Sequence, residues 1–230
     1  MYKIIRYWIV EGFNVKKIVT KLKEDYEQDN IDPRFIYALV RNCRQAIATY
    51  LRNIYALDTL ALTNAQQVIW VDEPLFVRNE GEQQWALGVI NTATNEIRLE
   101  LIINRDENTL KPIIEKHVGP GNIICSDSWA GYNFLSRANS CYVREVSNHQ
   151  LGQFGLTSRI EGILGEIKLL IKSMYISIRS KNFIYFLKEA EYRRSIKKFN
   201  PIDKIKDFSV VLSTVGADQY LDDYEVNYDD

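Results

Sequence analysis

The chain has 230 residues, of which 46% are hydrophobic and 26% are charged, an ordinary composition for a folded protein with one catalytic domain and a smaller addition. The net charge of −1 makes the protein as a whole neither basic nor acidic, and no apolar run of about 18 residues is present to span a membrane. The first residues lack a secretory signal pattern. The three cysteines form no CxxC pair, so they support neither a disulfide framework nor a zinc ribbon, and a reducing compartment is expected.

The small net charge conceals a segregation of charge along the chain. Residues 1–58 have a net charge of +3, residues 59–158 of −4, residues 159–198 of +6 and residues 218–230 of −6. Two basic zones therefore flank an acidic middle. Binding of a polyanion needs a local positive surface, which these zones offer, although solvated helix surfaces explain the charge as well when it is taken alone.

Residues 2–62 show the apolar spacing of short helices with basic residues beside it. Asp32-Pro33 marks the start of one of these helices, because aspartate is a good N-cap and proline suits the first helical position. We expect residues 1–62 to form an all-helical module. Either a helix-turn-helix that binds DNA or a helical cap on the main domain would produce this pattern.

Strand signals begin at residue 68 and alternate with helical segments up to residue 198. The expected strands are residues 68–72, 85–90, 97–103, 122–127 and 141–146, and the expected helices are residues 108–117, 160–175 and 183–197. Three strands joined by hairpins, then a helix, two strands and further helices, are the order of a ribonuclease-H-like domain. We therefore expect an α/β domain at residues 63–198, with a mixed five-stranded sheet flanked by helices. Residues 199–230 are expected to be an extension with an acidic, disordered tail from Asp218.

Three acidic residues stand where a metal site of such a domain would need them. Asp72 and Asp127 each follow an apolar strand, and Glu161 lies near the start of an amphipathic helix. Glu73 points to the opposite face of its strand from Asp72, because successive side chains alternate. Two carboxylates at strand ends and one on a later helix can hold a pair of hard divalent cations, which drive in-line attack on a phosphodiester. We expect Asp72, Asp127 and Glu161 to be the catalytic and metal-binding residues.

Basic residues near Glu161 are candidates for DNA contacts. Lys168 and Lys172 share one stripe of the helix with Glu161, where they would hold backbone phosphates. Arg159 precedes the glutamate, and His149, in the polar loop before the helix, could orient a phosphate or act as a general acid. An amphipathic helix with ordinary surface charges and an exposed loop histidine is the alternative explanation.

As an ordered set, the motifs over roughly residues 68–172 resemble the Merlin-type, ISXO-like group of DDE transposases. The matching stretches include Val71-Asp72-Glu73, Gly119-Pro120-Gly121, Ser126-Asp127-Ser128-Trp129, Asn148-His149 and Thr157-Ser158-Arg159-Ile160-Glu161-Gly162. The resemblance implies a ribonuclease-H-like core in which Asp72, Asp127 and Glu161 bind two Mg²⁺ or Mn²⁺ ions. It also implies DNA element ends and target DNA as partners, assembly as a homo-oligomer, and a nuclear location in a eukaryote or a cytoplasmic one otherwise.

The leading hypothesis is thus a DNA transposase, a polynucleotidyl transferase that cleaves DNA and transfers strands. The chain departs from the family pattern in lacking the frequent cysteine zinc ribbon, in having Leu156-Thr157-Ser158 in place of His-Thr-Asn, and in having Leu164 in place of a tryptophan. These departures keep open a truncated or decayed copy, and a catalytically inactive DNA-binding protein derived from a transposase. Another ribonuclease-H-like nuclease and an interaction protein without metal are the remaining alternatives.

Overall fold

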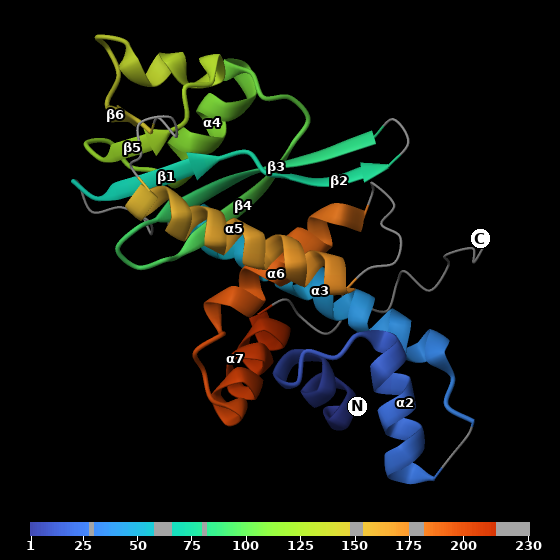
Figure 1. The fold of residues 1–230 in the computed structure, drawn as a ribbon. Helices are drawn as coiled ribbons and strands as arrows, with labels where there is room; N and C mark the ends of the chain where they lie inside the picture. The colour runs from blue at the N-terminus through green and yellow to red at the C-terminus, as the bar shows by residue number, and fades with distance from the viewer. Residues whose placement is uncertain (28–29, 58–65, 80–81, 148–153, 175–181, 215–230) are drawn as a thin grey trace. The chain divides into compact units, whose positions relative to one another are not determined.

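A computed structural model describes residues 1–27, 30–57, 66–79, 82–147, 154–174 and 182–214. The chain forms two compact units, one made of Met1–Arg52 together with the chain from Tyr192 onward, the other of Asn53–Glu191. The elements, labelled in Figure 1 where there is room, are α1 (Tyr2–Ile5), the π-helical turn η1 (Arg6–Val10), α2 (Val15–Tyr26), α3 (Pro33–Leu57), β1 (Val68–Asp72), β2 (Leu75–Asn79), β3 (Glu82–Asn91), β4 (Ile97–Ile102), α4 (Glu107–His117), β5 (Ile123–Ser126), the 3-10 helix η2 (Ala130–Ser136), β6 (Val143–Val146), α5 (Phe154–Met174), α6 (Phe183–Ser195) and α7 (Pro201–Thr214). Among the described residues, no helix combines the length and apolarity needed to cross a membrane.

The described part of the first unit is built from helices around Trp8. The Trp8 indole is 2% exposed and meets the Phe208 ring of α7 edge to face, with 5.6 Å between ring centroids. The Arg193 guanidinium lies 5.0 Å from the Trp8 ring and donates a hydrogen bond of 2.7 Å to the Trp8 carbonyl. The end of α6 and α7 thus pack with the N-terminal helices, and α7 is a helix that the sequence patterns did not predict.

The sheet of the second unit has six strands, and two of them, β1 and β2, pair one after the other with the same side of β3. β1 pairs antiparallel with β3 and parallel with β5, β5 pairs parallel with β6, and β4 pairs antiparallel with β3. β2 continues the line of β1 along β3, since Asp72 lies opposite Gly88 and Leu75 opposite Trp85. Pro74 interrupts the line because it has no N–H to donate to a strand ladder. This order is that of a ribonuclease-H-like fold, as expected, with the first strand broken directly after Asp72.

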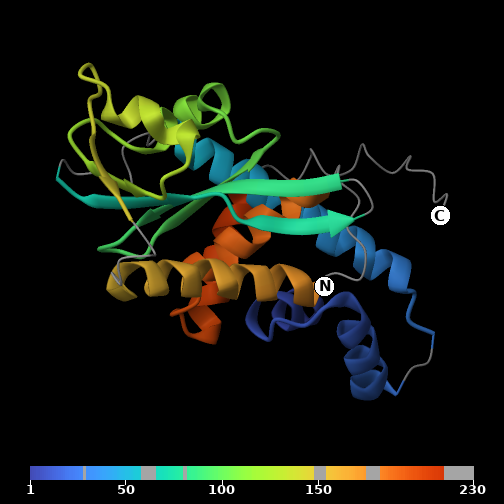
Figure 2. The ribbon, with the colours of Figure 1, turned by 45° about the horizontal axis from the view of Figure 1, so that its top comes forward.

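Helices cover both faces of this sheet, because alternate residues of its strands are apolar on both sides. On one face α5 and the first half of α6 pack on the sheet, through buried side chains that include Trp70, Leu99, Cys125, Leu164 and Leu187. On the other face α4 and η2 pack on it, through buried side chains that include Ile69, Val71, Leu110, Ile124 and Tyr132. Figure 2 shows the sheet between α5 on one side and α4 with η2 on the other.

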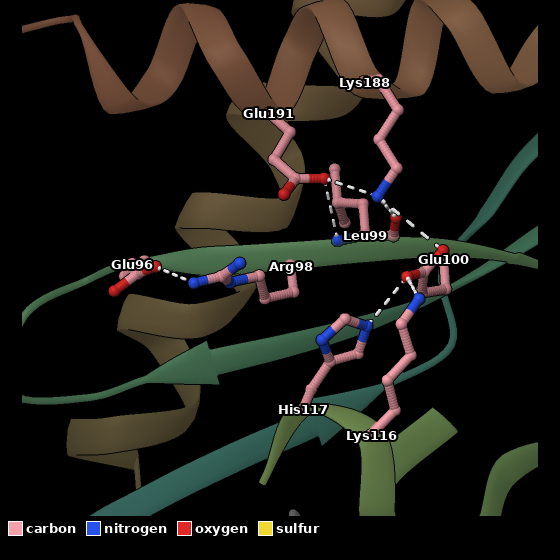
Figure 3. A network of polar contacts seen from close by, with 8 residues as sticks. All are labelled: Glu96, Arg98, Leu99, Glu100, Lys116, His117, Lys188 and Glu191. Carbon is pink, nitrogen blue, oxygen red and sulfur yellow. Dashed lines mark hydrogen bonds and ion pairs between the residues drawn. The ribbon is translucent and has the colours of Figure 1, made fainter. Parts of the chain in front are cut away.

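Two side chains of α6 cover the edge strand β4. The Glu191 carboxylate accepts a hydrogen bond from the Leu99 backbone N–H at 3.2 Å, and the Lys188 ammonium donates to the Leu99 carbonyl at 2.6 Å (Figure 3). Lys188 and Glu191 also form an ion pair of 3.1 Å. Edge strands present unpaired backbone groups that invite association with other strands. The two side chains satisfy these groups at Leu99 and so protect the edge.

Glu100, the next residue of β4, is the centre of a partly buried ionic network. Its Oε1 meets His117 Nε2 at 2.8 Å and Lys116 Nζ at 2.9 Å, and its Oε2 lies 3.7 Å from Lys188 Nζ (Figure 3). Burial would raise the pKa of Glu100, but the hydrogen bond to His117 and the charges of Lys188 and Lys116 hold this pKa well below its ordinary value. Burial lowers the pKa of Lys188 to about 8. The network ties α4 and α6 to the same strand.

Several expectations about the ends of the chain stay predictions. The domain bounds at residues 62 and 198, and a DNA-binding role for the N-terminal helices, are expectations of this kind. The acidic tail from Asp218 lies outside the described residues. The helix expected at residues 108–117 is α4, which begins one residue earlier because Asp106 caps it by accepting from the Thr109 N–H at 2.9 Å.

Candidate active site

Asp72 and Asp127 lie at the ends of neighbouring parallel strands, on the face of the sheet that α5 covers. The register of β1 and β5 pairs Trp70 with Cys125, and both of these side chains belong to the core beneath α5. Asp72 and Asp127 each follow two residues later, so they share that face and stand side by side beyond the last paired residues. Neighbouring strands are about 4.8 Å apart, which brings the two carboxylates within reach of one ion.

Backbone amides hold one oxygen of each aspartate. Oδ1 of Asp72 accepts from the N–H of Glu73, and Oδ1 of Asp127 accepts from the N–H of Trp129, both at 2.9 Å. Among the residues that the structure describes, none donates a hydrogen bond to Oδ2 of either aspartate. Both side chains are half-buried. The site therefore presents two oriented carboxylates, each with an oxygen available to a ligand.

The pKa of Asp72 reflects its burial and the charged groups around it. Burial raises the pKa of the Asp72 carboxyl above its ordinary value of 3.8, and the negative charge of Asp127 raises it further. The Glu73 backbone N–H and the positive charges of Lys168 and Arg105 act in the opposite direction. A nearby cation would favour the ionised form of Asp72, which burial and the charge of Asp127 disfavour.

Helix α5 approaches the sheet closely beside Asp72. A Cβ placed on Gly88, the cross-strand partner of Asp72, would lie 3.2 Å from Leu164 Cδ2 and 3.6 Å from the Asp72 carbonyl oxygen. Leu164 is 3% exposed, whereas Glu161 and Lys168, about one turn to either side of it, are exposed. The absence of a side chain at residue 88 thus lets α5 carry Lys168 to within electrostatic range of Asp72.

The structure brings together two of the three expected metal ligands. Within the described ranges, no three histidine, cysteine, aspartate or glutamate side chains lie close enough together to hold a metal ion. Asp72 and Asp127 are neighbours, and Glu161 is exposed on α5 without joining them in such a group. Metal binding by all three stays a prediction.

The expected DNA contacts are placed only in part. Lys168 and Lys172 are both exposed on α5, one turn apart. Arg159 lies in the first turns of α5, where side chains are not described. His149 lies outside the described residues.

Two arginines near the aspartates were not identified from sequence. Arg144 of β6 donates from Nη2 to the Asp127 carbonyl at 3.1 Å and from Nε to Ser126 Oγ at 3.3 Å. Arg105, in the loop between β4 and α4, donates to the buried carboxylate of Glu73 at 3.3 Å. Neither arginine stands in a motif or on a periodic stripe, so the sequence carries no local signal for these contacts.

Part of the chain matches the sequence pattern of a known protein family. The pattern of the ISXO2-like transposase domain matches residues 76–195, just over half of the chain. The matched segment contains Asp127, Glu161 and Lys168, and it begins four residues after Asp72. No curated protein matches the chain.

Solved structures of retroviral integration proteins are similar to part of the chain. A chain of the simian T-cell lymphotropic virus intasome in complex with PP2A regulatory subunit B56 gamma is 13% identical, with a TM-score of 0.42, and the match covers 59% of this chain and 50% of that one. The HTLV-2 integrase catalytic core domain in complex with magnesium, in its trimeric form, is 9% identical with a TM-score of 0.39, and the match covers 59% of this chain and 88% of the other. This chain thus spans half the length of the first of these relatives.

Proposed function

This chain belongs to the family of ISXO2-like transposase domains, and we propose that it is a DDE transposase that cuts DNA and transfers strands by metal-dependent in-line attack on phosphodiesters. Its narrower assignment to the Merlin-type group is part of the proposal. The observation that carries the proposal is the placement of Asp72 and Asp127 at the ends of two neighbouring strands, on one face of a ribonuclease-H-like sheet.

The chemistry of the two aspartates fits a divalent cation. Mg²⁺ and Mn²⁺ prefer carboxylate oxygens, and each aspartate keeps Oδ2 available while a backbone N–H orients Oδ1. We propose that Glu161 completes the ligand set and that two ions bind. Such ions, when bound, activate the attacking oxygen and stabilise the leaving oxygen.

The basic residues of α5 would serve the DNA backbone. Lys168 and Lys172 are exposed and one turn apart, so they can contact successive phosphates of one strand. We propose the same role for Arg159 and His149, which flank the start of α5. Because two element ends must be joined to one target, the active form is proposed to be a homo-oligomer.

Cleavage of DNA that carries the sequences flanking the gene, where the ends of a mobile element would lie, tests this proposal. The full chain is incubated with this DNA and Mg²⁺ or Mn²⁺, and strand cleavage and joining are read on a denaturing gel. Asp127→Asn should abolish both reactions, because it removes an anionic ligand while keeping the shape of the side chain. Asp106→Asn is the matched control, since asparagine caps α4 as well as aspartate does, and it should retain activity.

Other outcomes would identify other functions. Equal activity of Asp127→Asn and the unchanged chain would remove Asp127 from the chemistry and overturn the proposal. Salt-sensitive DNA binding without cleavage by any variant would identify the catalytically inactive DNA-binding protein instead. Cleavage of RNA or of DNA junctions, but not of element ends, would identify a different nuclease.

A further inference from the structure

Arg105 connects the segments that follow the two aspartates. Its Nη2 donates to Glu73 Oε2 at 3.3 Å, and its guanidinium lies 4.6 Å from the ring of Trp85 and 4.7 Å from the ring of Trp129. Its backbone carbonyl accepts a hydrogen bond of 2.7 Å from Trp129 Nε1. One loop residue therefore holds the end of β1, a residue of β3 and the turn after β5.

The residues that Arg105 holds are the same residues that orient the aspartates. Glu73 donates its backbone N–H to Asp72 Oδ1, and Trp129 donates its backbone N–H to Asp127 Oδ1. Each aspartate is thus one hydrogen bond away from a residue whose side chain contacts Arg105. A displacement of Arg105 would loosen both hydrogen bonds at once.

The burial of Glu73 strengthens its ion pair with Arg105. The Glu73 side chain is 0% exposed and Arg105 is 28% exposed, so the ion pair is largely shielded from water. A buried carboxylate that loses its cation is costly, which favours one position of the Arg105 loop.

Close packing of the backbone also keeps the Arg105 loop against the Asp127 turn. A Cβ on Gly131 would lie 2.5 Å from the Arg105 carbonyl oxygen and 2.9 Å from Cδ1 and Nε1 of Trp129. Only glycine at this position leaves room for the hydrogen bond between the carbonyl and the indole. The turn after β5 is therefore shaped to receive the Arg105 loop.

We infer that Arg105 is a positioning residue, which fixes Asp72 and Asp127 at the distance and orientation needed to share a divalent cation. The inference rests on the proposed function, because it assigns Arg105 a role in assembling the same metal site. Replacing a residue that orients metal ligands without contacting the ion changes metal affinity by about 10- to 100-fold. Arg105 touches neither the ion nor the DNA in this assignment.

The test compares Arg105→Gln and Arg105→Lys with a matched control, Arg137→Gln. Arg137 forms a bidentate pair with Glu107 at 2.6 and 2.7 Å, between η2 and α4, and contacts neither aspartate. The first measurement is the affinity of each full-length variant for Mn²⁺ alone, by titration calorimetry. The second is amide hydrogen exchange at Glu73 and Trp129 without metal. Circular dichroism establishes that each variant is folded.

We expect Arg105→Gln to weaken Mn²⁺ binding by about 10- to 100-fold and to accelerate exchange of both amides. Arg105→Lys should restore neither property, because lysine keeps the charge but lacks the planar fork that pairs with the carboxylate and stacks on the two rings. Arg137→Gln should leave both properties unchanged.

The outcomes separate this inference from the proposed function. Unchanged exchange at Trp129 and Glu73 in Arg105→Gln would overturn the positioning role, whatever the metal affinity. Full recovery in Arg105→Lys, or an equal loss in Arg137→Gln, would overturn it as well. If Asp127→Asn binds Mn²⁺ as tightly as the unchanged chain, the proposed metal site is wrong, and the exchange rates still decide whether Arg105 holds the turn.

Discussion

Replacement of Gly131 by alanine tests the packing of the Arg105 loop on the Asp127 turn. The new Cβ would stand 2.5 Å from the Arg105 carbonyl oxygen, whereas carbon–oxygen contacts are about 3.3 Å at their closest, so a shift of about 0.8 Å is required. The oxygen belongs to the backbone and cannot rotate away. The hydrogen bond of 2.7 Å from Trp129 Nε1 must therefore lengthen or break.

The expected cost follows from these contacts. Overpacking costs about 1–3 kcal/mol, and loss of the indole hydrogen bond adds about 1 kcal/mol. Alanine recovers about 0.5–1 kcal/mol because it restricts the unfolded chain more than glycine does. We therefore expect Gly131→Ala to lower the free energy of unfolding by about 2 kcal/mol.

Urea unfolding followed by tryptophan fluorescence measures this change, since three of the four tryptophans, Trp70, Trp85 and Trp129, lie in the sheet-containing unit. Gly165→Ala in α5 is the matched control, because a Cβ there has no neighbour within 4 Å. This variant should gain about 1 kcal/mol from helix propensity. A Gly131→Ala protein as stable as the unchanged chain would refute the reasoning, since the carbonyl would then have moved without cost.

The remaining predictions concern the core, the proposed DNA contacts of α5 and the ionic network around Glu100. Leu164→Ala should lower the free energy of unfolding by about 2–5 kcal/mol, because it leaves a cavity where α5 packs on the sheet. A negligible loss of stability in urea unfolding would contradict that packing. Lys168→Gln should weaken DNA binding and reduce the salt slope by about one, whereas Lys111→Gln on α4 should not; equal salt slopes in filter binding would exclude a phosphate contact by Lys168. The contribution of His117 and Glu100 to stability should fall as pH drops below the ordinary His117 pKa of 6.5, and further below the ordinary Glu100 pKa of 4.5, because the fold lowers both values and so favours neutral His117 and ionised Glu100. The difference in urea midpoint between the unchanged chain and Glu100→Gln, followed from pH 7 to pH 4, measures this fall, because the raised pKa values of Asp72, Glu73 and Glu191 act in the opposite direction in both proteins. A difference that does not change with pH would show that the fold does not lower the Glu100 pKa.

Sequence alone predicted five of the six strands in their chain order, missing β2 (Leu75–Asn79), and the face of the strand that presents Asp72. Both follow from local periodicity, since alternation along β1 places Asp72 with Trp70 and Glu73 with Val71, whatever surrounds the strand. The amphipathic helix that carries Glu161 and Lys168 was identified in the same way. Periodicity could not determine which turn of this helix meets Asp72, because that depends on how closely Leu164 packs on Gly88.

Only the tertiary structure determined the contacts that hold the aspartates and the sheet edge in place. Arg105 reaches Glu73 across 32 residues and Trp129 across 24, and Glu191 reaches Leu99 across 92. Such pairs are set by the paths of loops and by the packing of helices on the sheet, and no repeat or motif records them. The pairing of β1 with β5 places Asp72 and Asp127 on one face of the sheet, and the participation of Glu161 in the same site stays a prediction.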